Sequence, residues 1–376
     1  MRSFFDLAGG DFRETQHAMT GIGHLYRKPL EGLSTLPWLA QLLADDVDAA
    51  VHGLNCGTPT AEQLAQFAAT HHLGPLLWPR TDSIAVRDSL PETLRNQWQQ
   101  AYVRQWLANS NLARDLHRLH QAFTRTGKNV ILLKGPHLAT SYYGDLAQRK
   151  FEDIDLLVPS GSAKSYLRWL KNDLKLLSPM LLYSLRSHLT HAQVLSGEGL
   201  IVDLHWALRC HPSYAIDEPR IWQTRQAFTL PELGDRIDVL DDEYTLVLTL
   251  LEIFDDLSRL ELTVKDLIDA FLILRVVDHS MDWQGFFARR KTEHLYRITI
   301  DVLMLILKLF DAHNLLPTLV SNLKTQAPKE CQGLEMVLRP GNRWHALWSY
   351  RLSLYEMSRW VTVPYLLFSG PIRVVL

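Results

Sequence analysis

Three aspartates, separated into two groups along the chain, are the residues best suited to do chemistry in this sequence. Asp153 and Asp155 lie in an apolar run that ends at Val158, and Asp203 lies in another apolar run that follows Gly199. Side chains alternate between the two faces of a strand, so Asp153 and Asp155 point to the same side if the first run is a strand. Two carboxylates on one surface raise each other's pKa unless a cation bridges them. The pattern therefore predicts a divalent-cation site, which Asp203 would complete from a neighbouring strand.

Two basic residues and a glycine precede the paired aspartates. An apolar run ends at Lys134-Gly135, and Pro136 suits the first position of a helix. A glycine between a strand and a helix lets backbone amides approach phosphate oxygens at the positively polarised start of the helix. Lys134 and Arg149 would supply positive charge to such phosphates or to the carboxylates. The rival interpretations are structural: Lys134 would extend from a strand end into solvent, and Arg149 would pair with an acidic residue that follows it.

The aspartates also have plainer interpretations. Asp153 and Asp155 would simply be solvated at a strand end, and His205, on the same face as Asp203, would simply pair with it. The other histidines that suggest a metal site by composition have no recognisable ligand spacing and are interpreted as structural. These are His137, His188, His191 and His211.

The motifs resemble the putative nucleotidyltransferase family within the DNA polymerase beta-like nucleotidyltransferase superfamily. The similarity lies in Leu133-Lys134-Gly135, Tyr143, Arg149, the Asp-Ile-Asp-Leu-Leu-Val run from Asp153 to Val158, and Asp203-Leu204-His205-Trp206. The chain departs from the family in having Pro136 where members often have a small residue, and Asp203 where the nearest relatives often have glutamate.

The resemblance implies a nucleotidyltransferase that moves a nucleoside monophosphate from an NTP, such as ATP, to an acceptor hydroxyl by a two-metal mechanism. It gives Asp153, Asp155 and Asp203 as catalytic metal ligands, with Asp203 on the ion nearest the acceptor. The ions would be two Mg²⁺, with Mn²⁺ as the alternative. Lys134, Gly135 and Arg149 would bind the nucleotide. Two other functions stay open: a catalytically inactive binding or scaffold protein with this fold, and a toxin-like transferase that acts on tRNA or protein.

The order of patterns predicts an α+β protein in which helical regions flank a small mixed-sheet core. Apolar residues recur at helical spacing up to about residue 125, short apolar runs alternate with helical segments up to about residue 240, and long helical segments then return. We therefore expect an N-terminal helical region over 1–125, a nucleotidyltransferase-like catalytic core over 126–240 and a C-terminal helical domain over 241–376.

Individual elements follow from the same patterns. Thr58-Pro59-Thr60 resembles a capped helix start with Pro59 just inside the helix, and a long helix opens at Leu90-Pro91-Glu92 and ends at Gly127. A hairpin turn over 196–199 would place Asp203 beside the first two aspartates. The other segments expected are a strand over 130–133 and helices over 162–177, 246–254, 264–277, 283–290 and 296–310.

Composition narrows the partners. The chain has 376 residues with 39 basic and 41 acidic side chains, so no global field attracts nucleic acid. A small molecule, a peptide or a protein is therefore favoured over nucleic acid as the acceptor. The sequence does not fix the oligomeric state.

The cysteines and the apolar windows bear on location. Three cysteines are widely spaced and form no Cys-x-x-Cys motif, which indicates a reducing cytoplasm. Acidic residues interrupt the N-terminal segment where an export signal would be apolar. The apolar window 297–310 is too short to span a bilayer, and prolines interrupt the window 360–376, so we expect no transmembrane segment.

Overall fold

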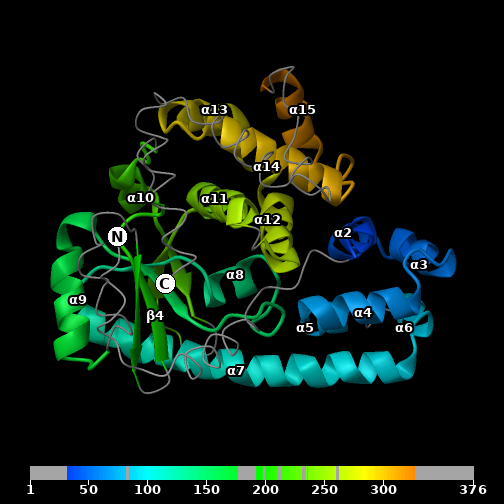
Figure 1. Cartoon of the computed structure of the whole chain (residues 1–376), viewed down its shortest axis with the longest axis horizontal. Coiled ribbons are helices and arrows are strands. Elements are labelled where there is room, and N and C mark those ends of the chain that lie inside the picture. The colour runs from blue at the N-terminus through cyan, green and yellow to red at the C-terminus, as the bar shows by residue number, and fades with distance from the viewer. Residues whose placement is uncertain are drawn as a thin grey trace, which may run out of the picture.

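The computed structural model describes residues 32–81, 84–176, 192–197, 200–209, 214–230, 234, 236–259 and 262–326. Within these ranges the chain forms a six-stranded mixed sheet with helices beside it and further helices before and after it in sequence (Figure 1). The predicted α+β class is confirmed. The segment 360–376 and residues His188, His191 and His211, discussed above, lie outside the described residues.

Short helices precede one long helix in the N-terminal part. The capping box at Thr60 starts α4: the Thr60 hydroxyl accepts from the Gln63 amide at 3.2 Å, and the Gln63 side chain accepts from the Thr60 amide at 3.0 Å. Pro59 therefore precedes the cap, and its predicted position inside the helix is wrong. The helices are η2 (Leu33–Thr35), α2 (Leu36–Leu43), α3 (Val47–Asn55), α4 (Ala61–His71), α5 (Gly74–Arg80), α6 (Ile84–Asp88) and α7 (Glu92–Arg125).

The long helix α7 leads directly into the sheet. It starts after Pro91, as predicted, and ends before Gly127, which adopts a positive φ of 64°. The sheet has the strand order β3-β4-β2-β1-β6-β5. Its strands and the intervening helices are β1 (Ile131–Leu132), α8 (Pro136–Ser141), β2 (Ile154–Leu157), η3 (Ser160–Ser162), α9 (Ala163–Asn172), β3 (Ala192–Gly197), β4 (Leu200–His205), α10 (Glu218–Thr224), β5 (Gln226–Thr229) and β6 (Arg236–Val239).

Pairing within the sheet is mixed. β2 pairs with β4 in parallel and β1 pairs with β6 in parallel, whereas β1–β2, β3–β4 and β5–β6 are antiparallel. The predicted antiparallel pairing of the two segments that form β3 and β4 is confirmed, since Gly197 pairs with Leu200. The predicted turn bounds are too wide, because Ser196 and Gly197 belong to β3.

Three details differ from the prediction. The strand expected over 130–133 has only two residues in β1, and β5 and β6 were not predicted because such short strands are defined mainly by their partners. α9 ends at Asn172, earlier than expected. Lys175 has a positive φ of 55°, and the Leu176 amide turns back to donate to the Leu170 carbonyl at 3.1 Å.

Two large apolar cores lie on opposite faces of the sheet. Leu156 and Leu204 pack with α7 and α9 on one face. Ile131 and Leu157 face the other way and join a larger core shared by the N-terminal helices and the C-terminal helices. Side chains that alternate with Leu156 therefore point toward the second core.

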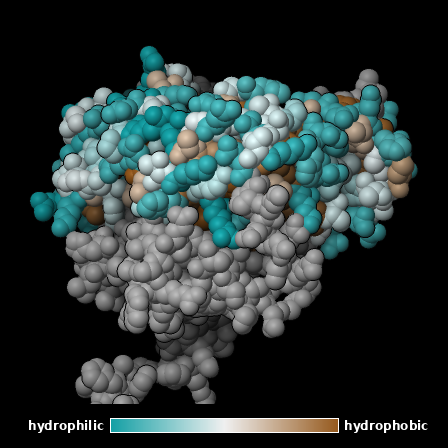
Figure 2. Space-filling view, turned by 90° about the horizontal axis from the view of Figure 1, so that it is seen from above, coloured by the Kyte–Doolittle hydropathy of each residue, from teal (hydrophilic) through white to brown (hydrophobic). Residues whose placement is uncertain are grey.

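The C-terminal helices follow the predicted segments closely. They are α11 (Asp242–Arg259), α12 (Val264–Val277), α13 (Trp283–Thr292), α14 (Tyr296–Leu309) and α15 (Pro317–Gln326). Acidic residues occupy the first turn of α11, as expected. No helix among the described residues is long and apolar enough to cross a membrane. On the face drawn in Figure 2, the coloured surface is mainly hydrophilic and apolar residues are scattered.

Candidate metal centre

Two neighbouring parallel strands bring distant aspartates together. Asp155 on β2 lies directly opposite Asp203 on β4, and the next pair in the register is Leu156 and Leu204. Because the leucines fill the core beneath α7 and α9, the aspartates point to the other face of the sheet. The structure thus places Asp203 on the same side as Asp155, as the hairpin prediction required.

His205 completes a compact cluster with these two aspartates. Its Nε2 atom lies 3.3 Å from Asp155 Oδ1 and 3.3 Å from Asp203 Oδ2. One ligand atom from each of the three residues lies within 4.8 Å of the others. The second oxygen of Asp203, Oδ1, is buried and has no hydrogen-bond partner among the described residues. The carboxylate oxygens can ligate a divalent cation directly, and the imidazole nitrogen can do so once it has lost its proton, so this donor set fits a metal ion.

Asp153 lies just before the first residue of β2 and is half-buried. It is not part of the group whose ligand atoms converge. Burial and the negative charge of Asp155 raise the pKa of Asp153 to about 6. Its predicted role as a metal ligand stays a prediction.

The charge states of the cluster follow from its neighbours. Burial alone would raise the pKa of Asp155, but the Lys134 ammonium group and the hydrogen bond from His205 outweigh burial and hold this pKa well below its usual value. Burial would lower the pKa of His205, but its hydrogen bonds to both aspartates raise it to about 9. Around neutral pH the cluster therefore consists of an ionised Asp155 beside a protonated imidazole.

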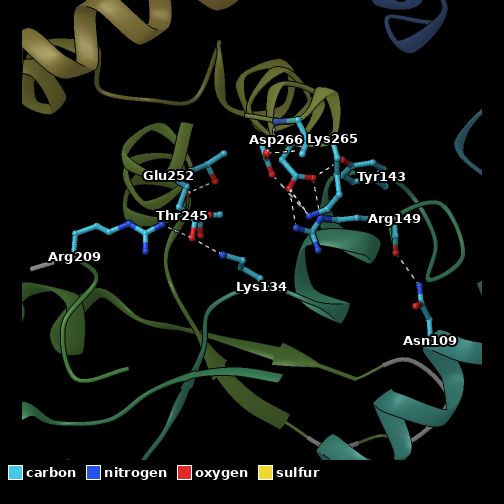
Figure 3. A network of polar contacts seen from close by, with 12 residues as sticks. Asn109, Lys134, Tyr143, Arg149, Arg209, Thr245, Glu252, Lys265 and Asp266 are labelled. Carbon is cyan, nitrogen blue, oxygen red and sulfur yellow. Dashed lines mark hydrogen bonds and ion pairs between the residues drawn. The ribbon is translucent and has the colours of Figure 1, made fainter. Parts of the chain in front are cut away.

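Lys134 does not extend into solvent. Its ammonium group forms an ion pair with Glu252 of α11, and Arg209 also contacts Glu252, at 2.7 Å (Figure 3). Burial lowers the pKa of Lys134, but Glu252 and Asp155 outweigh burial and raise it. The charge of Lys134 therefore acts on Glu252 of α11 and on the group formed by Asp155, Asp203 and His205, which is called the acidic cluster below.

Arg149 is paired with a helix of the C-terminal part rather than with its acidic neighbours in sequence. Its guanidinium group donates to Asp269 of α12 at 2.8 and 2.7 Å, and the Tyr143 hydroxyl donates to the same carboxylate. Asn109 of α7 donates to the Arg149 carbonyl at 2.8 Å (Figure 3). Arg149 is buried and donates two hydrogen bonds to Asp269. It therefore forms a structural ion pair, as one of the two interpretations expected, but with Asp269 and not with the acidic residues that follow it in sequence.

Gly135 lies at the predicted junction, and Pro136 is the first residue of α8, as expected. Gly135 adopts φ 61° and ψ −123°, a conformation that a side chain disfavours. The nearest side-chain atom to an added Cβ would belong to Phe151, at 3.8 Å. The glycine is therefore required by the backbone, and its nucleotide-binding role stays a prediction.

Glu252 and Asp269, the acidic partners of the two basic residues, were not predicted from the sequence. Both lie inside strongly apolar helical segments of the C-terminal part. A buried carboxylate requires a cationic partner. An acidic residue inside an apolar helical segment was therefore a signal in the sequence that such a pair exists. The identity of the partner could not be predicted, because it depends on how α11 and α12 pack beside the sheet.

The chain is similar to a known protein family and to a solved structure. A family model described as "Uncharacterised nucleotidyltransferase" matches residues 58–311, more than half of the chain. Among solved structures, the chain is similar to the crystal structure of an antigenic nucleotidyltransferase-like protein from Paracoccidioides brasiliensis, with 15% sequence identity and a TM-score of 0.31. That match covers 55% of this chain and 92% of the other. No curated protein matches the chain.

Proposed function

Because the chain belongs to the family described as uncharacterised nucleotidyltransferases, we propose that it transfers a nucleoside monophosphate from an NTP to an acceptor hydroxyl. The observation that carries the proposal is the convergence of Asp155, Asp203 and His205 on one face of the sheet. On the strength of the motifs, we place the family in the DNA polymerase beta-like superfamily.

Widely spaced cysteines support a cytoplasmic setting.

Asp155 and Asp203 would hold the Mg²⁺ ions, and Asp153 would add a ligand from its position just before β2. Two bound Mg²⁺ ions would stabilise the negative charge that develops on the attacking and leaving oxygens. Asp155 is ionised well below neutral pH and is therefore ready to bind a cation. The unpartnered Oδ1 atom of Asp203 offers a second acceptor on the same face.

Lys134 is the basic residue best placed to act on the triphosphate. It comes at the end of β1, directly before Gly135, and its charge already acts on Asp155. Glu252 holds the lysine in this position. Arg149 would act indirectly, since its guanidinium group is bonded to Asp269.

A transfer assay tests the proposal. Purified protein is incubated with each α-labelled NTP, Mg²⁺ and a cell extract, and the wild type is compared with Asp155→Asn and Asp203→Asn. We expect both substitutions to lower labelling at least about 100-fold, because each removes a metal-binding charge. Asp173→Asn, an exposed position after α9, is the matched control and should label like the wild type. Equal labelling by Asp155→Asn and the wild type would contradict the proposal.

One observation favours a second function, a catalytically silent binding protein. His205 Nε2 bonds both Asp155 and Asp203, so a protonated imidazole already offsets part of the negative charge of the acidic cluster without a metal. In that case Mn²⁺ would bind weakly to the wild type, and His205→Asn would bind it more tightly. Isothermal titration with Mn²⁺ distinguishes the two functions, because an active site should bind the ion in the wild-type protein.

A further inference from the structure

The exposed side of α7 carries a row of arginines. Arg104, Arg114, Arg118 and Arg125 are all exposed. At 100° per residue they fall within one stripe about 80° wide, opposite the buried side of the helix. From Arg104 to Arg125 the helix holds a single acidic residue, Asp115, which pairs with Arg118 at 3.2 Å. The stripe is therefore strongly positive over roughly 30 Å.

The neighbouring helix α9 has the same character. Lys164, Arg168 and Lys171 are exposed at spacings of four and three residues, so they share one side of the helix. α9 contains no acidic residue. Its apolar side, which includes Tyr166 and Leu170, is buried against the sheet.

These two helices meet near the carboxyl end of α7. Phe123 of α7 lies 5.9 Å from Tyr166 and 5.0 Å from Trp169 of α9, measured between ring centroids. Lys128, between α7 and β1, lies over the same two rings, at 5.3 and 5.7 Å. Because both helices turn their apolar sides to one face of the sheet, their basic sides point away from it. We call the seven exposed arginines and lysines of α7 and α9 the basic layer.

We propose that the basic layer binds the phosphate backbone of a folded RNA. A protein with a net charge of −2 that gathers seven cations and one acidic residue on these helix faces presents a local field suited to a polyanion. The length of the α7 stripe fits a repeating backbone rather than a single small anion. This inference goes beyond the proposed function, because the basic layer and the acidic cluster lie on opposite faces of the sheet.

Two further features favour a nucleic acid with unpaired bases. Val103, Trp106 and Leu107 are exposed at the amino-terminal end of the stripe. Unpaired bases stack on exposed aromatic side chains, and folded RNA supplies loops whereas duplex DNA does not. At the other end, an open depression of ≈ 460 Å³ is lined by Arg125 and Arg236, together with His120, Gln121 and Thr124.

An anionic membrane is the less favoured partner. A helix that binds a membrane surface inserts its apolar side among the lipids. The apolar side of α9 is buried against the sheet. On α7 the exposed apolar residues Val103, Trp106 and Leu107 are confined to the amino-terminal end of the stripe, and the arginines occupy the rest of it.

Binding to a fluorescent RNA stem-loop tests the proposal. The variant K164Q/R168Q/K171Q removes three charges from α9, and R104Q/R114Q/R118Q removes three from α7. We expect each to weaken binding by about tenfold or more and to flatten the salt dependence by about one unit of slope per lost phosphate contact. The matched control R297Q/K308Q/K324Q removes three charges from α14 and α15, which lie across the molecule from α7 (Figure 1). It should bind like the wild type.

Further variants and competing ligands complete the test. K164R/R168K/K171R keeps the charge and should retain binding, and thermal melting of every variant checks folding. Asp155→Asn should also retain RNA binding, which separates this proposal from the catalytic one. Unchanged RNA binding by both glutamine variants would overturn the proposal. So would equal affinity for a DNA duplex without a loop, or preferential binding to phosphatidylserine vesicles.

Discussion

Two buried cations near the sheet are paired with carboxylates supplied by the C-terminal helices. Lys134 and Arg149 meet Glu252 and Asp269, which lie more than 100 positions later. Breaking such a pair leaves an uncompensated charge in a medium that solvates it poorly. At the scale of single residues, the polar contacts are therefore as constrained as the apolar core.

Arg149→Met should destabilise the protein by about 3–5 kcal/mol, because it leaves the Asp269 carboxylate buried without its guanidinium partner. The double variant Arg149→Met/Asp269→Leu should recover much of this loss, since it removes both charges. Urea unfolding of the two variants and the wild type measures the difference. A loss below about 1 kcal/mol in the single variant would show that this pair contributes little to stability.

His137 should make stability depend on pH. Burial, with a smaller contribution from Arg149, lowers its pKa to about 4 from 6.5. The unfolded chain therefore takes up the proton first, and stability is lost as pH falls from about 6.5 to about 4. The loss should reach on the order of 3 kcal/mol.

Comparison with His137→Leu isolates the contribution of this histidine. The variant cannot titrate at this position, so its unfolding free energy should fall less than that of the wild type over the same pH range. Chemical denaturation at several pH values provides the measurement. Parallel curves for the two proteins would rule out a role for His137.

At the scale of elements, local signals fix where many of the helices begin, and pairing fixes the strands. The capping box of α4, the proline before α7 and the acidic first turn of α11 can all be read in the sequence. β5 and β6 are too short to be recognised alone and are defined by their pairing with each other and by the parallel pairing of β6 with β1. The acidic cluster depends on strand pairing, because the pairing of β2 with β4 places Asp155 directly opposite Asp203.

Thr60→Ala should destabilise the protein by about 1 kcal/mol, because the Gln63 amide loses its acceptor at the start of α4. Thr60→Ser keeps the hydroxyl and serves as the control, with a change of a few tenths of a kcal/mol at most. Thermal melting of the three proteins gives the comparison. Equal losses in both variants would mean that the threonine methyl group, not the hydroxyl, matters here.

At the scale of the whole molecule, the sheet separates two different surroundings. Its acidic face is turned toward the C-terminal helices, whereas its other face is covered by α7 and α9, whose outer sides are basic. A net charge near zero conceals this separation. The preference for a small or proteinaceous acceptor came from net charge alone, and the basic layer now argues for RNA as a partner.

Metal binding should stabilise the whole fold, since an ion bound only by the folded state shifts the unfolding equilibrium. At 100 times its Kd, an ion adds about 2.7 kcal/mol. We therefore expect Mn²⁺ to raise the Tm of the wild type and to leave that of Asp155→Asn/Asp203→Asn unchanged. Differential scanning calorimetry with and without the ion measures this. An equal rise in both proteins would locate metal binding outside the acidic cluster.

The sequence by itself determined the α+β class, most helix positions, and the proximity of Asp203 to Asp155, because these depend on periodicity, capping and one hairpin. Only the tertiary structure decided that His205 bridges Asp155 and Asp203, and that Lys134 and Arg149 are held by Glu252 and Asp269. It also decided that the basic sides of α7 and α9 face away from the sheet together. Contacts between distant segments depend on how helices pack on a sheet, and no local pattern encodes that packing.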